Sequence, residues 1–128
     1  MTQIAAHVWP QYEAHLLAAS GLIPVLSPGS SFIGIGGGMA DVTYTGMSAA
    51  SIAQAGLRAA YRHLAKESRA RRVAVRQLVL HSMIAGESNA DNADPSWITA
   101  EQVGRAVCEM VQDDGDSPEA VLDLRPSS

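Results

Sequence analysis

The chain has 128 residues, of which 47% are hydrophobic, 17% are charged and 5% are aromatic. This composition is typical of one modest globular domain and excludes an intrinsically disordered or collagen-like chain. The net charge of -4 and the lack of a basic patch interleaved with aromatic residues exclude nucleic acid as an expected partner. No apolar run has the length of a membrane span, and the N-terminus does not resemble a signal peptide, so we expect a cytoplasmic protein with no membrane partner.

The first half of the chain predicts two helices, each followed by a strand. Apolar residues recur at helical spacing over residues 8–19, and residues 31–36 form a short apolar run bounded by glycines, which is typical of a buried strand. A long helix is expected over residues 48–68, because Ala, Leu, Arg and Lys dominate that segment. A second apolar strand is predicted over residues 73–80.

The second half begins with a polar segment, residues 85–96, which is predicted to be a loop. Thr99 and Gln102 have the spacing of a capping box, so a helix is expected over residues 99–112. A final short strand is predicted over residues 120–124. Helices and strands therefore alternate, which favours an α/β fold with a parallel sheet.

Several segments resemble, in their order and spacing, parts of a short-chain dehydrogenase/reductase (SDR) domain. They are Gly29–Ile35, Ala55-Gly56-Leu57 with Leu64–Glu67, Arg72–Val75 and Ile98–Val103. The likeness covers most of residues 8–124, so the chain resembles the C-terminal half of such a domain. It implies a partial Rossmann-like, SDR-type fold with about three parallel strands and three main helices, in a single truncated domain over residues 1–128.

The resemblance bears directly on the cofactor. Members of the family bind NAD(H) or NADP(H) through an N-terminal glycine-rich turn, which the resemblance places outside this chain. The glycines of residues 36–38 do not replace it, because residues 41–46 separate them from the next helix. We expect no cofactor on this chain alone, and NAD(P) only if a partner supplies the nucleotide-binding half. The spacing of the four histidines predicts no metal site.

The family's catalytic chemistry requires a tyrosine, a lysine four residues later and an upstream serine. Registered on the long helix, the resemblance places Ala50 at the tyrosine position, Gln54 at the lysine position and Gly37 near the serine position. Neither alanine nor glycine can transfer a proton. We therefore predict that the catalytic residues are absent and that the chain is not an autonomous enzyme. If it is enzymatic, the resemblance implies an SDR-type oxidoreductase.

Two other residues remain as candidates for proton transfer. Tyr44 precedes the long helix, but Ser48, which carries no positive charge, stands four residues later, so a loop contact is favoured. His81 ends a predicted strand at the carboxyl edge of the sheet, where α/β folds bind ligands. No carboxylate is visibly paired with it in the sequence, so a structural role is favoured.

Two stripes run along the predicted helix over residues 48–68. Small residues recur at Ala49, Ala53, Gly56 and Ala60, and larger ones, which are expected to face the sheet, at Ile52, Leu57, Tyr61 and Leu64. A stripe of small residues allows a second helix to approach closely. In the family, the two corresponding helices form four-helix dimer interfaces, so we predict that the small-residue stripe is an interface.

These observations favour a non-catalytic subunit whose role is association. The strand over residues 31–36 would lack the neighbour that a complete domain provides, and an open apolar edge is a template for pairing. A homo-oligomer or an SDR-like partner subunit is therefore expected. Three alternatives stay open: one part of an NAD(P)-dependent oxidoreductase assembled with another chain, a cofactor-free enzyme that reuses the old cleft, and a truncated gene product.

Overall fold

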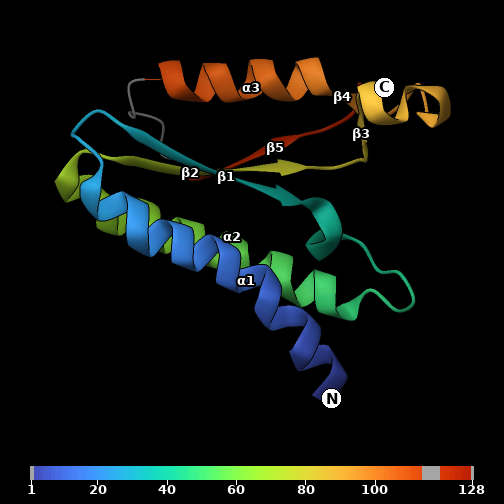
Figure 1. Ribbon diagram of the computed structural model, residues 1–128, viewed down its shortest axis with the longest axis horizontal. Coiled ribbons are helices and arrows are strands. Elements are labelled where there is room, and N and C mark those ends of the chain that lie inside the picture. The colour runs from blue at the N-terminus through green and yellow to red at the C-terminus, as the bar shows by residue number, and fades with distance from the viewer. Residues whose placement is uncertain (1, 114–118, 128) are drawn as a thin grey trace.

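The computed structural model describes residues 2–113 and 119–127. Three layers are present (Figure 1). Helices α1 (Thr2–Leu22) and α2 (Ser48–Ser68) cover one face of a sheet, and α3 (Ala100–Gln112) covers the other. The sheet has the order β1-β2-β5, with all neighbours parallel, and consists of β1 (Ser31–Gly37), β2 (Ala74–Leu80) and β5 (Val121–Leu124). The predicted α/β class with a three-stranded parallel sheet is confirmed.

Two segments differ from their expected form. Helix α1 begins at Thr2 rather than near residue 8 and continues through Pro10. The polar segment predicted as a loop holds a 3₁₀ helix (Glu87–Asn92) between two short paired strands, β3 (Ile84–Ala85) and β4 (Ile98–Thr99).

The side chain of Asn89 accounts for the order in this segment. Its amide donates to the carbonyl of Ile84 and accepts from the backbone N–H of Gly86, both at 2.9 Å. Side-chain bonds of this kind let a polar segment fold locally without an apolar pattern. The hydrophobic periodicity of the sequence therefore gives no sign of it.

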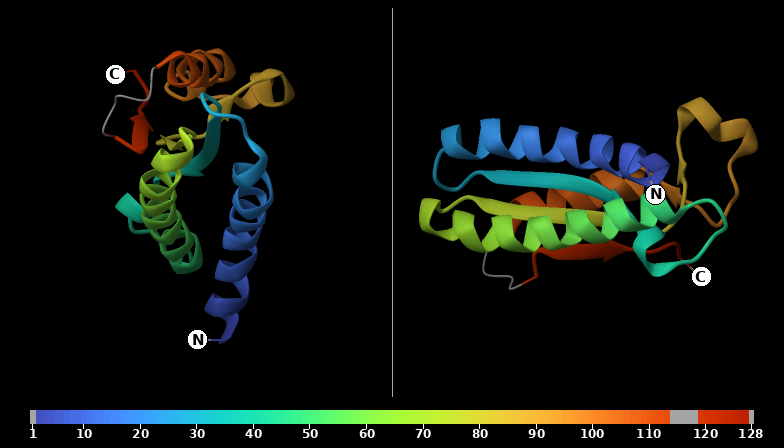
Figure 2. Two further views of the ribbon diagram at one scale, coloured as in Figure 1. Left: turned by 90° about the vertical axis from the view of Figure 1, so that its left-hand side faces the viewer. Right: turned by 90° about the horizontal axis from the view of Figure 1, so that it is seen from below.

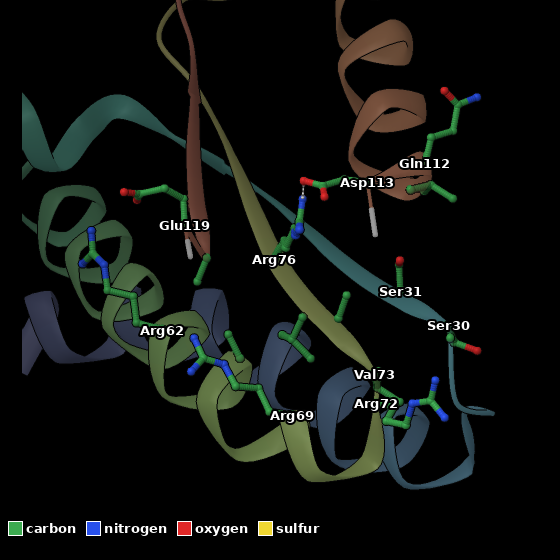
Figure 3. Close-up of a pocket in the computed structure, with 16 residues that line it drawn as sticks. Ser30, Ser31, Arg62, Arg69, Arg72, Val73, Arg76, Gln112, Asp113 and Glu119 are labelled. Carbon is green, nitrogen blue, oxygen red and sulfur yellow. Dashed lines mark hydrogen bonds and ion pairs between the residues drawn. The ribbon is translucent and has the colours of Figure 1, made fainter. Parts of the chain in front are cut away.

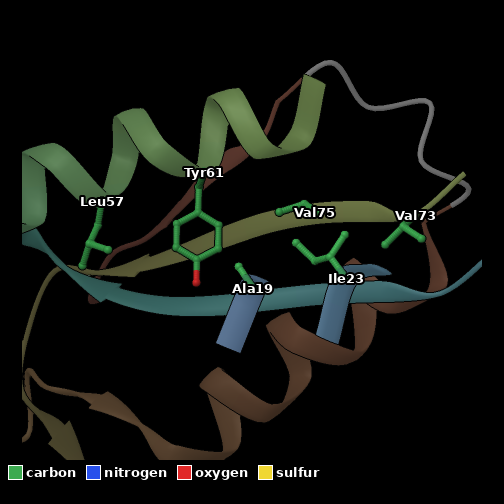
Figure 4. Close-up of a cluster of buried hydrophobic side chains, with 6 residues drawn as sticks. All are labelled: Ala19, Ile23, Leu57, Tyr61, Val73 and Val75. Atoms are coloured by element: carbon green, nitrogen blue, oxygen red, sulfur yellow. The ribbon is translucent and has the colours of Figure 1, made fainter. Parts of the chain in front are cut away.

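Alternation along β2 creates one core on each face of the sheet. The core beneath α1 and α2 is shown in Figure 4 and consists of Ala19, Ile23, Leu57, Tyr61, Val73 and Val75. The core beneath α3 consists of Leu78, Leu80, Ile98 and Met110. The predicted capping box begins α3, because Thr99 Oγ1 accepts from the backbone N–H of Gln102 at 3.1 Å.

Two glycines of β1 make room for polar side chains from the neighbouring elements. A Cβ atom built on Gly34 would overlap the hydroxyl of Tyr61, and one built on Gly36 would overlap the amide of Gln77. Gly34 is thus close-packed against a side chain of α2, and Gly36 against a side chain of β2. None of the helices in the described part of the chain is long and apolar enough to cross a membrane.

Candidate functional site at the carboxyl edge of the sheet

Two side chains of α2 hold the last residue of β1. The side-chain carbonyl of Gln54 accepts from the backbone N–H of Gly37 at 2.9 Å, and Arg58 Nη2 donates to the Gly37 carbonyl at 3.4 Å. The structure thus brings together Gly37 and Gln54, the positions that the resemblance assigns to serine and lysine. The third position, Ala50, is half-buried on α2. None of these three side chains can donate or remove a proton.

Arg58 also forms a bidentate ion pair with Asp41, the last residue of a 3₁₀ helix (Gly38–Asp41). Its two terminal nitrogens lie 2.8 and 2.7 Å from the two carboxylate oxygens. The hydrogen bond from Arg58 lowers the pKa of Asp41, and the same bond raises the pKa of Arg58. Sequence reasoning missed this pair. The only signal is that Arg58 lies one helical turn after Gln54 and so shares its face of α2.

His81 follows β2 and pairs with a carboxylate of the adjacent strand. Its Nε2 lies 2.6 Å from Asp123 Oδ1, and its Nδ1 lies 3.9 Å from Asp41 Oδ2, with the side chain only 8% exposed. The sequence-based argument that no carboxylate partners His81 is therefore wrong. The two residues meet because β2 and β5 are neighbours, with the His81 N–H donating to the Leu124 carbonyl at 3.0 Å.

Tyr44 lies apart from this cluster. Its side chain is 63% exposed, and its backbone carbonyl accepts from the Met47 N–H at 3.2 Å, which closes a turn before α2. Among the residues that the structure describes, no hydrogen bond joins its phenol to His81 or Arg58. The expectation of a loop contact for Tyr44 stays a prediction.

Gln77 is a further polar residue of this region that sequence reasoning did not single out. It lies in β2 with its side chain fully buried, and neither atom of its amide has a hydrogen-bond partner among the described residues. A buried polar group without a hydrogen-bond partner lowers the free energy of unfolding by about 1–3 kcal/mol. A single glutamine in an apolar strand pattern gives no sequence signal of this position.

The small-residue stripe of α2 is used inside the chain. Ala53 is fully buried on the helix face that carries Leu57 and Tyr61, so it cannot line an interface. A Cβ atom on Gly56 would overlap the hydroxyl of Tyr12, which shows that α1 packs on this position. Ala49 and Ala60 are half-buried. Ala53 is therefore unavailable to a partner, and the interface role predicted for Ala49, Gly56 and Ala60 stays a prediction.

The stripe of larger residues also differs from expectation at one position. Leu57 and Tyr61 face the sheet as predicted, but Ile52 is exposed, and its carbonyl accepts from the Tyr12 hydroxyl at 3.0 Å. In the described part of the chain, no three or more His, Cys, Asp or Glu side chains are grouped so that they could hold a metal ion.

Comparison with known proteins shows which solved structures have a similar fold. No family model matches the sequence, and neither does any curated protein. A short-chain dehydrogenase from Burkholderia cenocepacia J2315, solved in complex with NADP, is similar in structure with a TM-score of 0.71 and 21% identity, over 90% of this chain and 52% of that one. The protein BdcA, solved in complex with NADPH, has a TM-score of 0.63 and 18% identity, over 94% of this chain and 53% of its own. The chain thus spans about half the length of these structures, and it has a Rossmann-like fold similar to theirs.

Proposed function

We propose that this chain is a non-catalytic, SDR-like subunit whose role is to associate with another copy of itself or with an SDR-like partner chain. The observation that carries this proposal is the open edge of β1. The Ser30 carbonyl accepts from Ala74 N–H on β2 at 2.9 Å. Because backbone groups alternate in direction along a strand, those of Ser31, Ile33 and Ile35 point away from β2. No strand among the described residues pairs with that side.

The elements on the β1 side of the sheet also expose apolar side chains. Helix α1 lies over the β1 side of the sheet, whereas α2 lies toward β5 (Figure 2). The outer surface of α1 and the turn after it expose large apolar residues, namely Trp9, Leu17, Leu22 and Val25, and Ile35 is exposed in β1 itself. An apolar surface beside unpaired backbone groups favours association.

The chemistry of the carboxyl edge supports a role other than catalysis. The three positions that the resemblance assigns to proton transfer hold Gly37, Ala50 and Gln54. Two of these residues are hydrogen-bonded to each other, because the Gly37 N–H donates to the side-chain carbonyl of Gln54. The similar solved structures that hold NADP or NADPH are about twice as long as this chain. We expect NAD(P) to bind here only when a partner supplies the nucleotide-binding half.

Light scattering coupled to size-exclusion chromatography tests the association. We expect the purified chain to have a mass of at least twice the 13.4 kDa of one chain. Leu17→Glu places a charge on the exposed face of α1 and should reduce that mass. Met83→Glu is the matched control, because Met83 is also exposed but follows β2 at the far end of the sheet. A wild-type chain that stays monomeric at all concentrations contradicts self-association.

Cofactor binding is tested separately by the thermal shift of the chain with NADPH. We expect NADPH to raise Tm no more than an equal concentration of pyrophosphate does, because we expect a partner chain to supply the glycine-rich turn that binds the cofactor in the family. A saturable increase in Tm beyond that caused by pyrophosphate would contradict this part of the proposal.

The pairing of His81 with Asp123 favours a second candidate, a cofactor-free enzyme that transfers protons at the old cleft. A carboxylate 2.6 Å from a largely buried imidazole can fix the orientation of the ring. Proton NMR of ketone substrates in deuterated water would detect this activity as exchange of the protons next to the carbonyl group. Exchange that is lost in His81→Ala but kept in His63→Ala, an exposed histidine on α2, would favour this candidate.

A further inference from the structure

A hollow of about 500 Å³ lies at the opposite, amino edge of the sheet. Its walls are the ends of α2 and α3, the beginnings of β1 and β2, and the residues just before β5 (Figure 3). The topology explains why it exists. β5 pairs only with Gln77–Leu80, so Ala74, Val75 and Arg76 have no strand on that side among the described residues. This half of β2, which β5 does not cover, forms the floor of the cavity.

Four arginines line this cavity. Arg62 lies on α2, Arg69 begins the 3₁₀ helix (Arg69–Arg71) that follows α2, Arg72 comes directly after that turn, and Arg76 lies in β2. The backbone fixes Arg72, which has a left-handed conformation with φ 58° and whose carbonyl accepts from the Gly29 N–H at 2.8 Å. A left-handed residue at this place ends the helical turn and starts the strand.

Arginines outnumber carboxylates among the described residues that line the cavity. Arg76 is buried and paired with Asp113 at 2.8 Å. Arg62, Arg69 and Arg72 have no ion pair with any residue that the structure describes. Glu119 also lines the cavity, and it takes part in an interaction of its own. Among the described residues, four arginines and two carboxylates line the cavity, on a chain whose net charge is -4.

We propose that this cavity binds the phosphoryl group of a small phosphorylated molecule. A guanidinium group matches the geometry of a phosphate with two parallel hydrogen bonds, and the hydroxyls of Ser30 and Ser31 line the same cavity as further donors. The volume lies within the range of about 300–1,000 Å³ that small-molecule sites occupy. The site lies at the other edge of the sheet from His81 and Gln54, and the proposal does not depend on the association proposed above.

Titration calorimetry of the full chain with pyrophosphate, in a buffer of physiological ionic strength, tests the site. We expect saturable binding of one pyrophosphate per chain. The Arg69→Gln, Arg72→Gln double variant should bind at least about tenfold more weakly, because charge-assisted hydrogen bonds are lost. Both arginines are exposed, so the double variant should fold, and its circular dichroism spectrum checks this.

Arg105→Gln is the matched control. It removes one positive charge from α3, against two in the double variant, but Arg105 pairs with Glu101 and does not line the cavity. We expect its affinity for pyrophosphate to equal that of the wild type. Equal weakening by Arg105→Gln would mean that pyrophosphate responds only to net charge, and this would overturn the proposal.

The location of binding is read from backbone amide chemical shifts. Pyrophosphate should move the signals of Ser31, Arg72 and Arg76 and leave that of His81 unchanged. Shifts confined to the carboxyl edge, or no saturable binding by the wild type, would also overturn the proposal.

Discussion

The side-chain carbonyl of Gln54 accepts a hydrogen bond from the backbone N–H of Gly37 at 2.9 Å, which joins α2 to the end of β1. The N–H of Gly37 points to the open side of β1, where no strand in the described part of the chain receives it. Gln54 therefore satisfies a donor that an edge strand would otherwise leave to water or to a partner. A side chain at the position that the resemblance assigns to a catalytic lysine has a structural task here.

Removal of this acceptor should destabilise the fold. Gln54→Ala leaves a partly buried donor without its partner, and we expect the free energy of unfolding to fall by about 1 kcal/mol. Urea denaturation followed by circular dichroism measures the change. Gln112→Ala, at an exposed position near the end of α3, serves as control and should change the midpoint little. Equal midpoints for both variants would show that the Gln54 bond contributes nothing.

The glycines of β1 should differ sharply in their tolerance of a side chain. A methyl group on Gly34 collides with the Tyr61 hydroxyl, whereas a Cβ atom on Gly37 meets no atom within 4 Å. We expect Gly34→Ala to cost about 1–3 kcal/mol, as overpacking does, and Gly37→Ala to stay within about 0.5 kcal/mol of the wild type. Thermal unfolding compares the two variants directly. A Gly34→Ala protein as stable as wild type would mean that Tyr61 does not lie above β1.

Tyr61 should make the protein sensitive to alkali. Burial raises the pKa of Tyr61, so between about pH 10 and that raised value the folded state keeps a proton that the unfolded state has lost. Stability conferred in this way is present below about pH 10 and is lost as the pH rises further. We expect the fall in unfolding free energy above pH 10 to be smaller in Tyr61→Phe.

The same substitution removes a hydrogen bond of 2.7 Å between the Tyr61 hydroxyl and His15 Nδ1, so a loss of about 1 kcal/mol is expected at pH 7. Urea midpoints between pH 7 and 11 separate the two effects. Tyr44→Phe is the control, because the Tyr44 side chain is exposed, and its profile should follow the wild type. An unaltered alkaline slope in Tyr61→Phe would assign the loss to other groups.

Asp41 should contribute to stability in the opposite range of pH. The hydrogen bond from Arg58 lowers the pKa of Asp41 below the ordinary value of 3.8, so its stabilising effect is present above that value and is lost as the pH falls below it. Because the carboxylate is partly exposed, the pair should be worth at most about 1 kcal/mol. Asp41→Asn should lower the urea midpoint at pH 6 and have little effect at pH 2.5. Asp91→Asn, at an exposed site, should change neither midpoint.

Local sequence determined the elements of this protein. Helical and strand periods, together with the Thr99–Gln102 capping box, predict three helices and three strands, and their alternation predicts the parallel sheet. These signals suffice because each depends on residues within a few positions of one another. The SDR resemblance uses the same segments, and the fold is similar to that of a solved short-chain dehydrogenase.

Only the tertiary structure decided which side chains meet. His81 and Asp123 are 42 residues apart and pair because β2 lies beside β5, and Arg58 reaches Asp41 because α2 crosses the end of β1. The burial of Ala53 depends likewise on how α2 is rotated against the sheet. Such contacts are set by strand order and helix packing, which join distant segments, and no spacing within a single segment encodes them.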